Sequence, residues 1–293
     1  MGICTSSGTL HSDQCRELAL VIEQGGSNMW RIGVWLIMKL TRLGETALED
    51  IKNTLRSFFL GEDEFYGFGI EELKQDYHWK ISESIRAAFP GLPAGDGYEA
   101  NVALKKDMSR RWWEATSPHE RERLTRFIVV DWGGIKGNKE SRYSEYAMAA
   151  SKDVPEIGFA GIASFSKVLA IRDPERYAIF DARVAVALNA IHIIGRPTTG
   201  ELYPYLPGRN NVTGSVVTKR GFSTLPENAR KHLSQQHPGW VRMPRETAYQ
   251  SYLALLNSVN SALPHPAPIY DLEMCLFSQA EKLACRASPV LAQ

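Results

Sequence analysis

The sequence predicts a mainly α-helical protein. Apolar residues recur every three or four positions along most of the chain, which is the spacing of amphipathic helices. Apart from residues 214–219, no stretch of useful length alternates apolar and polar residues as a strand does. The 293 residues, 44% of them hydrophobic, suit one large domain or two packed ones. We divide them into an N-terminal helical region, residues 1–97, and a second helical domain, residues 98–293.

In the first region, the apolar spacing predicts three amphipathic helices, at residues 27–44, 45–60 and 69–89. Gly44 and Gly61 stand where helix ends are expected. A loop rich in proline and glycine closes the region at residues 89–97.

In the second region, helices are predicted at residues 98–116 and 118–132, with Ser117 as N-cap and Pro118 in the first helical position. Three glycines break the pattern within residues 132–139. Helices at 140–151, 161–171 and 182–195 follow, and then an irregular excursion at 195–223. Three closing helices are predicted at 224–236, 245–263 and 270–285.

Cysteine spacing argues against a zinc ribbon and against a four-cysteine iron–sulfur cluster, because no C-x-x-C pair is present. The four cysteines are Cys4, Cys15, Cys275 and Cys285. No cluster of His, Cys and carboxylates has ligand spacing, so we expect no metal and no cofactor. The best apolar run, residues 29–40, is too short to span a bilayer. We expect a cytoplasmic protein without membrane contact.

Charge is unevenly distributed, although the net charge is only +1. Acids outnumber bases nine to three in residues 45–76. Bases outnumber acids ten to six in residues 105–142 and seven to one in residues 209–245. Such a basic middle can lie on a phosphate backbone, and it is equally compatible with ordinary solvated surface.

The segment 158–189 carries the most informative pair of charges. It places Lys167 in an apolar, small-residue helix and Asp181 fourteen residues later, at the start of the next apolar helix. Burying an amine and a carboxylate is costly unless they interact. Such a pair can cleave an N-glycosidic bond, with one group attacking the sugar and the other stabilising charge and moving protons. Separately, Asp181 can be an ordinary N-cap, and Lys167 a lysine with a buried stem and a solvated amine.

Five motifs in the second region carry a resemblance to a known superfamily. They are D-W-G-G-I-K (131–136), G-x-x-x-F-x-K (161–167), I-F-D-x-R-V (179–184), Y-x-x-Y-L-x-x-L-N (249–257) and Y-D-L-E-M-x-L-F (270–277). Together they resemble helix-hairpin-helix DNA glycosylases, and within these a bacterial branch similar to the 8-oxoguanine enzymes. The usual hairpin L-P-G-V-G is absent, and Gly158 and Gly161 stand in its place.

The resemblance implies a two-lobed helical fold with the active site between the lobes, and it places the hairpin and catalytic segment at 155–195. It implies that Lys167 and Asp181 are catalytic and that the partner is double-stranded DNA carrying a modified base, which is flipped out of the duplex. Some of this branch resemble anti-phage glycosylases that excise hypermodified cytosines such as glucosylated hydroxymethylcytosine. A repair glycosylase for oxidised purines such as 8-oxoguanine, a non-catalytic DNA-binding protein and a helical protein unrelated to nucleic acids are the alternatives.

Other candidate site residues surround this pair. Aromatic residues that can stack on an extruded base, with a place in the core as the alternative, are Trp132, Phe159, Phe165 and Phe180. Residues that can contact phosphates are Gly158, Gly161, Ser164, Lys136 and Arg183. The excursion after residue 195 can contact an unusual base through Tyr203, Tyr205, Arg209, Asn210 and Asn211. We expect a monomer without an obligate protein partner.

Overall fold

The computed structural model describes residues 48–153, 155–156, 158–196, 201–204, 206 and 241–291. The chain divides into two compact units, Met1–Glu49 and Asp50–Gln293. The boundary that we expected after residue 97 therefore falls inside the second unit. Residues on both sides of it, such as Phe58 and Leu104, belong to one continuous hydrophobic core.

The mainly helical class is confirmed by the elements of the second unit. Residues 50–60 are helical. The helices that follow are η1 (Asp63–Phe65), α3 (Leu73–Asp76), α4 (Glu83–Ala88), α5 (Tyr98–Glu114), α6 (Pro118–Arg126), the π-helix η2 (Phe127–Trp132), α7 (Ser141–Ala150), α8 (Ile162–Arg172), α9 (Ala182–Gly195), α12 (Arg245–Ser261) and α13 (Ile269–Leu291). Two short strands, β1 (Glu201–Leu202) and β2 (Val241–Arg242), pair in parallel.

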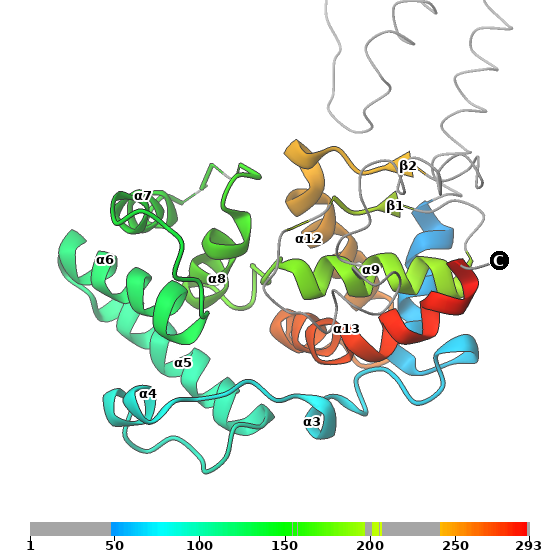
Figure 1. Ribbon diagram of the computed structural model, residues 1–293, viewed down its shortest axis with the longest axis horizontal. Coiled ribbons are helices and arrows are strands. Elements are labelled where there is room, and N and C mark those ends of the chain that lie inside the picture. Colours follow the sequence, from blue (N-terminus) through cyan, green and yellow to red (C-terminus); the bar gives the residue numbers. More distant parts are fainter. Residues whose placement is uncertain are drawn as a thin grey trace, which may run out of the picture. The chain divides into compact units, whose positions relative to one another are not determined.

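The helices form two groups (Figure 1). The first helical group comprises α4 to α8, which lie together on the left of the view, and the second comprises α9, α12 and α13 on the right. Within the second group, α9 packs along α13. The chain passes from the first group to the second through residues 173–181, so this connector and the start of α9 lie where the groups meet.

Several predicted helix ends have the expected chemistry. Ser117 caps α6, and Glu120 completes a capping box, with Pro118 in the first turn. The predicted helix at 118–132 extends as far as expected, but it changes to π winding at Phe127. The predicted helices at 161–171 and 182–195 correspond closely to α8 and α9.

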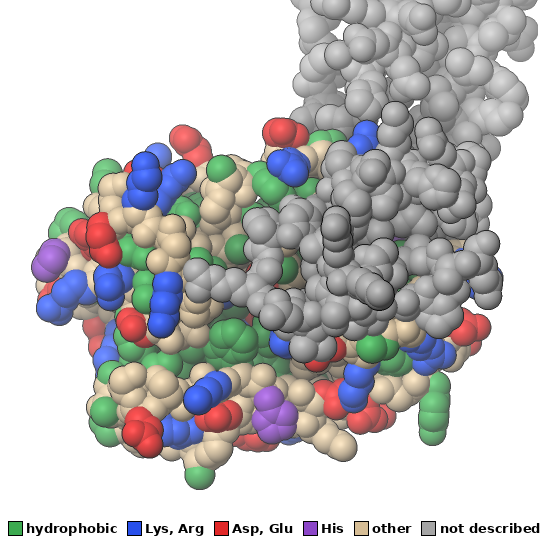
Figure 2. Space-filling view, in the orientation of Figure 1, with side chains coloured by type: hydrophobic (Ala, Val, Ile, Leu, Met, Phe, Trp, Pro, Cys, Tyr) green, Lys and Arg blue, Asp and Glu red, His purple; other side chains and the backbone are tan. Residues whose placement is uncertain are grey.

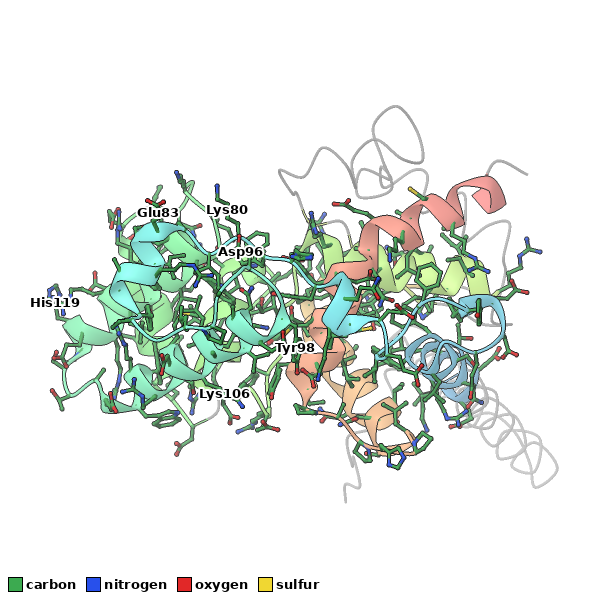
Figure 3. The ribbon with its side chains drawn as sticks, turned by 90° about the horizontal axis from the view of Figure 1, so that it is seen from below. Lys80, Glu83, Asp96, Tyr98, Lys106 and His119 are labelled. Atoms are coloured by element: carbon green, nitrogen blue, oxygen red, sulfur yellow. The ribbon has the colours of Figure 1, made fainter. Side chains whose placement is uncertain are left out.

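The single helix predicted at residues 69–89 is wrong. The residues between α3 and α4 are not helical, and their polar groups bond to the following loop and α5 instead (Figure 3). The backbone N–H of Trp79 donates to the backbone oxygen of Asp96 at 3.1 Å, and the backbone N–H of Ile81 donates to Asp96 Oδ1 at 3.2 Å. Asn101 Nδ2 donates to Trp79 O at 3.0 Å. These tertiary bonds replace the helical ones that the apolar spacing favoured.

Buried tyrosines of α12 hold the connector in place. The Tyr249 hydroxyl donates to Ala178 O at 2.9 Å, and the Tyr252 hydroxyl donates to Ile179 O at 3.2 Å. Both tyrosines are almost fully buried. Because buried carbonyl groups need hydrogen-bond donors, these contacts fix the backbone immediately before Asp181.

Some predicted elements lie outside the described residues: the helices at 27–44 and 224–236, residues 214–219 and most of the excursion at 195–223. In the described part of the chain, no helix is long and apolar enough to cross a membrane.

Candidate active site

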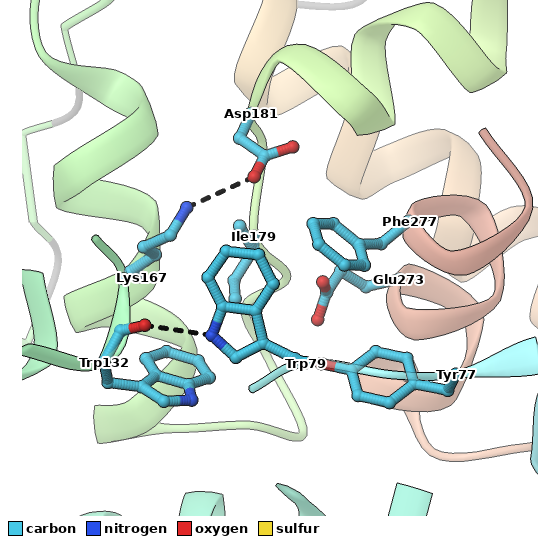
Figure 4. A pocket seen from close by; sticks show the side chains of 9 residues that line it. Tyr77, Trp79, Trp132, Lys167, Ile179, Asp181, Glu273 and Phe277 are labelled. Atoms are coloured by element: carbon cyan, nitrogen blue, oxygen red, sulfur yellow. Dashed lines mark hydrogen bonds and ion pairs between the residues drawn. The ribbon is translucent and has the colours of Figure 1, made fainter. Parts of the chain in front are cut away.

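A small pocket lies where the two helical groups meet (Figure 4). Its empty space, including the part open to solvent, is about 290 Å³. The first group contributes residues from η2 and α8, and the second contributes the start of α9 and one face of α13. The lining residues are Tyr77, Trp79, Trp132, Gly133, Lys167, Ile179, Asp181, Glu273 and Phe277.

The two predicted catalytic residues meet in this pocket. Lys167 Nζ lies 3.3 Å from Asp181 Oδ2, and the two side chains are 7% and 18% exposed. Lys167 Nζ also donates to Ala163 O at 3.2 Å. The amine is therefore held inside the protein beside a carboxylate and does not extend into solvent as a surface lysine does.

Asp181 performs two structural tasks with different oxygens. Its Oδ1 accepts the backbone N–H groups of Arg183 at 3.0 Å and Val184 at 3.3 Å, which caps α9. Its Oδ2 faces Lys167. The cap on one oxygen and the ion pair on the other together fix the orientation of the Asp181 side chain.

Local packing explains how Lys167 reaches the pocket. A Cβ added at Gly133 would lie 2.9 Å from Lys167 Cδ and equally close to two carbonyl oxygens of η2. Glycine therefore leaves room for the lysine stem beneath the end of the π-helix. The same turn presents the Trp132 carbonyl, which accepts the Trp79 indole N–H at 2.9 Å. π-Helical turns of this kind are frequent at functional sites.

A second buried ion pair lies beside the first. Lys105 Nζ donates to Glu273 Oε2 at 2.8 Å, and the side chains are 5% and 2% exposed. The ammonium group also lies 6.0 Å from the centre of the Trp132 ring. Burial raises the pKa of Glu273, and the neighbouring Lys105 opposes that rise. Burial likewise raises the pKa of Tyr77, with further contributions from Glu273 and Asp181.

Aromatic rings form the remaining walls. Phe277 meets Trp79 edge to face, with ring centres 5.4 Å apart, and Trp132 is the one predicted stacking residue that lines the pocket. The guanidinium of Arg183 lies 4.8 Å from the Phe277 ring centre, and it donates to Glu281 at 2.8 Å. Arg183, expected to contact a phosphate, is thus engaged in an ion pair at the edge of this wall.

The other three predicted stacking residues lie elsewhere, which corrects that part of the prediction. Phe180 is fully buried and packs against Tyr252, with ring centres 5.2 Å apart. Phe165 is buried and stacks on Tyr146. Phe159 is half-buried and does not line the pocket. The apolar spacing of these three residues therefore reflects packing within the protein. Periodicity alone could not distinguish this alternative from a role in binding a base.

The predicted phosphate contacts are only partly exposed. Gly158, Gly161 and Lys136 lie at the surface, and Gly161 adopts a left-handed conformation, with φ of 77°, as the N-cap of α8. Ser164, in contrast, is buried, and its hydroxyl accepts Asn138 Nδ2 at 2.9 Å. The prediction for Ser164 is therefore corrected, because its hydroxyl secures the preceding loop from inside.

The excursion after α9 contributes to the core where it is described. Tyr203 is fully buried, and its N–H donates to Asn189 Oδ1 at 2.7 Å. It therefore packs inside the protein and does not extend toward a substrate. Tyr205, Arg209, Asn210 and Asn211 lie outside the described residues.

Acidic neighbours offset much of the positive charge expected in residues 105–142. Acidic and basic side chains intermix over the first helical group (Figure 2). Arg110 bonds to Glu114 at 3.0 Å, and Arg142 bonds to Glu145 at 2.9 Å. Lys105 is buried against α13. On the face shown, this region does not form a patch of a single sign.

The sequence prediction missed six residues that line the pocket and one beside it. The lining residues are Tyr77, Trp79, Gly133, Ile179, Glu273 and Phe277, and the neighbour is Lys105. Two of these had a detectable signal. Glu273 lies between Leu272 and Met274, and further apolar residues follow it on a predicted helix; Lys105 directly follows Leu104 on another predicted helix. A charged residue inside an apolar run is rarely buried without a partner, so the two were candidates for one buried pair.

Comparisons with protein-family models, curated proteins and solved structures found no match to this chain. In the described part of the chain, no group of three or more His, Cys, Asp and Glu residues is arranged to hold a metal ion. The chemistry of the site must therefore be argued from its own geometry.

Proposed function

We propose that this chain is a DNA glycosylase, which flips a modified base out of double-stranded DNA and cleaves its N-glycosidic bond to leave an abasic site. One observation carries the proposal: Lys167 and Asp181 lie 3.3 Å apart in an aromatic-walled pocket between two helical groups. In this proposal the groups are the two lobes of a glycosylase-like fold, and the pocket is its active site.

Asp181 has the geometry to stabilise a positively charged sugar. Breaking a glycosidic bond leaves an oxocarbenium-like sugar, and a fixed carboxylate near C1′ lowers the energy of that state. Asp181 is fixed because Oδ1 is bound to two backbone N–H groups of α9. Its orientation is therefore set before the substrate arrives, so little reorganisation is needed during reaction.

Lys167 has two possible roles in the reaction. In the first, it transfers a proton to Asp181 and attacks C1′ through the neutral amine. The C1′–N bond to the base breaks, its electrons leave with the base, and the base takes up a proton from the lysine nitrogen now bound to C1′. The C1′–O4′ bond then opens as the lone pair of the lysine nitrogen forms the C1′=N bond and O4′ takes the proton held by Asp181. The product is a protonated imine that permits strand cleavage. In the second, Lys167 orients Asp181 and a water molecule, and hydrolysis leaves an intact abasic strand. The 3.3 Å contact supports proton transfer in either route.

For the substrate we propose a hypermodified cytosine of phage DNA, such as glucosylated hydroxymethylcytosine, excised in antiviral defence. The aromatic walls Trp79, Trp132 and Phe277 suit an extruded planar base. The two alternatives are excision of an oxidised purine and DNA binding without excision, and each gives a different result in the following experiment.

The test is incubation with DNAs that carry different base modifications, followed by mass spectrometry of released bases. Wild type should release a modified base, whereas Lys167→Ala and Asp181→Asn should not. A matched control is the Lys282–Asp76 pair, which bonds at 2.7 Å outside the pocket. Lys282→Ala and Asp76→Asn should retain activity. If the wild type binds DNA but releases no base from any of these DNAs, the chain is a DNA-binding protein and the enzyme proposal is wrong.

Borohydride reduction distinguishes the two roles of Lys167. An imine between Lys167 and the sugar would be reduced to a stable protein–DNA adduct, detectable as a shifted band in a denaturing gel. Loss of that adduct in Lys167→Ala would support covalent chemistry. Base release without an adduct would support direct hydrolysis.

A further inference from the structure

One hydrogen-bond donor in the pocket has no acceptor among the described residues. The Trp132 indole Nε1 is buried and lacks a hydrogen-bond partner in this part of the chain, and the residue is 4% exposed. Leaving a buried N–H unsatisfied destabilises the protein. Such a cost is reasonable where the donor is satisfied by a ligand, and Trp132 lines the pocket.

Glu273 provides a hydrogen-bond acceptor in the same pocket. Its Oε2 accepts Lys105 Nζ at 2.8 Å, and its carboxylate extends toward Trp79 (Figure 4). Among the described residues, no hydrogen-bond donor contacts its Oε1. Burial raises the pKa of Glu273 and Lys105 opposes that rise; with an ammonium donor 2.8 Å from Oε2, the other oxygen is placed to act as an acceptor.

We propose that Glu273 and Trp132 read the edge of the extruded base and select a pyrimidine with an exocyclic 4-amino group. This inference rests on the proposed function and defines its substrate class. The 4-amino group donates to Glu273, as cytosine N4 does to carboxylates in DNA recognition. The Trp132 N–H donates to a ring nitrogen or carbonyl acceptor on the same base. Phe277 and Trp79 then contact the ring itself.

The arrangement also rejects the corresponding 4-oxo pyrimidine. In the same orientation, a uracil-type base places its O4 against the Glu273 carboxylate, so two acceptors face each other. A buried carboxylate that loses its donor is penalised, which is how polar sites reject near-identical ligands. The preference therefore depends on Glu273 Oε1 accepting a hydrogen bond, an arrangement that the Lys105 ammonium on Oε2 supports from outside the pocket.

The experiment compares two duplexes that differ at this one position. One contains glucosylated 5-hydroxymethylcytosine and the other glucosylated 5-hydroxymethyluracil, and single-turnover base release is measured for each. Wild type should release the cytosine-type base about 10–100 times faster. Trp132→Phe keeps the ring but removes the N–H, so it should slow release of the cytosine-type base about tenfold. Glu273→Gln, whose amide can donate to O4, should reduce or reverse the preference.

The control is Asp271→Asn, a carboxylate-to-amide change on α13 that lies outside the pocket, where Asp271 accepts the Tyr98 hydroxyl. It should leave the preference unchanged. Equal release of both bases by the wild type would overturn the inference while the proposed function stands, and so would release of 8-oxoguanine alone. Release of neither base and of no other would instead overturn the proposed function. If Glu273→Gln fails to fold, the wild-type ratio and Trp132→Phe still decide.

Discussion

Replacing Asp181 with asparagine or with alanine separates its two roles. Asparagine keeps an oxygen that can accept the Arg183 and Val184 N–H groups, and it is as good an N-cap as aspartate. Alanine removes both the cap and the partner of Lys167. If Asp181 both caps α9 and acts on the substrate, the two variants should differ in stability and agree in their loss of activity.

The expected loss of stability in each variant follows from the N-cap and from the burial of the ion pair. Losing an N-cap costs about 1 kcal/mol. Breaking a fully buried ion pair costs about 3–5 kcal/mol, and an exposed pair is worth about 0–1 kcal/mol. With Lys167 at 7% and Asp181 at 18% exposure, we expect about 2 kcal/mol for this pair. Asp181→Ala should therefore lose about 3 kcal/mol, from the cap and the ion pair together. Asp181→Asn keeps the capping oxygen but places an NH2 donor where Oδ2 accepted Lys167, so it should lose only the ion pair, about 2 kcal/mol.

Thermal unfolding and single-turnover base release measure the two effects. At about 2–4 °C per kcal/mol for a chain of this size, the loss of the cap should lower Tm by about 2–4 °C more in Asp181→Ala than in Asp181→Asn. Base release should fall by roughly 10²–10³-fold in both, because each lacks the fixed negative charge. An asparagine variant that releases base at the wild-type rate would reduce Asp181 to a helix cap. Equal destabilisation in the two variants would refute the capping argument.

Three further predictions test the fold and the second ion pair. Gln279→Leu removes two 2.9 Å hydrogen bonds to the backbone of Gly69 and should cost about 1–3 kcal/mol; an unchanged urea midpoint would contradict this. Hydrogen bonds from the backbone N–H groups of Ser117, the N-cap of α6, and of Thr116 lower the pKa of Glu120 from its ordinary 4.5 to about 2. Its stabilisation is complete above pH 4.5 and disappears toward pH 2, so Glu120→Gln should weaken acid sensitivity of unfolding in that interval, and an unaltered pH profile would count against the capping box. Replacing Lys105 and Glu273 together by Met and Leu should leave stability unchanged or raised yet abolish base release; retained release would exclude Glu273 from the site.

Much of the second unit could be predicted from local patterns. The helices α8 and α9 follow from apolar spacing, and Asp181 follows from N-cap chemistry, because both signals lie within a few consecutive residues. Sequence proximity also explains why Lys167 could be paired with Asp181 from the sequence. Fourteen residues separate the pair, and a single connector between two helices brings them together.

The segment between α3 and α4 shows where local patterns fail. Its residues have helical spacing, yet hydrogen bonds to Asp96 and Asn101 hold it away from helical geometry. This segment supplies Tyr77 and Trp79 to the pocket. Tertiary hydrogen bonds set the backbone conformation of this segment, and apolar spacing cannot reveal them. This one cause explains both the wrong helix prediction and the omission of these two residues.

The two buried ion pairs are better explained by chemistry than by stability. Replacing a buried pair by apolar side chains is often neutral or stabilising, so neither Lys105–Glu273 nor Lys167–Asp181 is needed to hold a helical core together. Other described pairs, such as Arg110–Glu114, lie at the surface, where charge is inexpensive. Both costly pairs instead contribute a carboxylate to one pocket. One carboxylate lies beside an amine that can attack or move protons, and the other lies near a buried N–H without an acceptor among the described residues. The cost of removing charges from water is thus concentrated in the pocket where the proposed base would be held. This is expected if these residues are present because they act on a ligand.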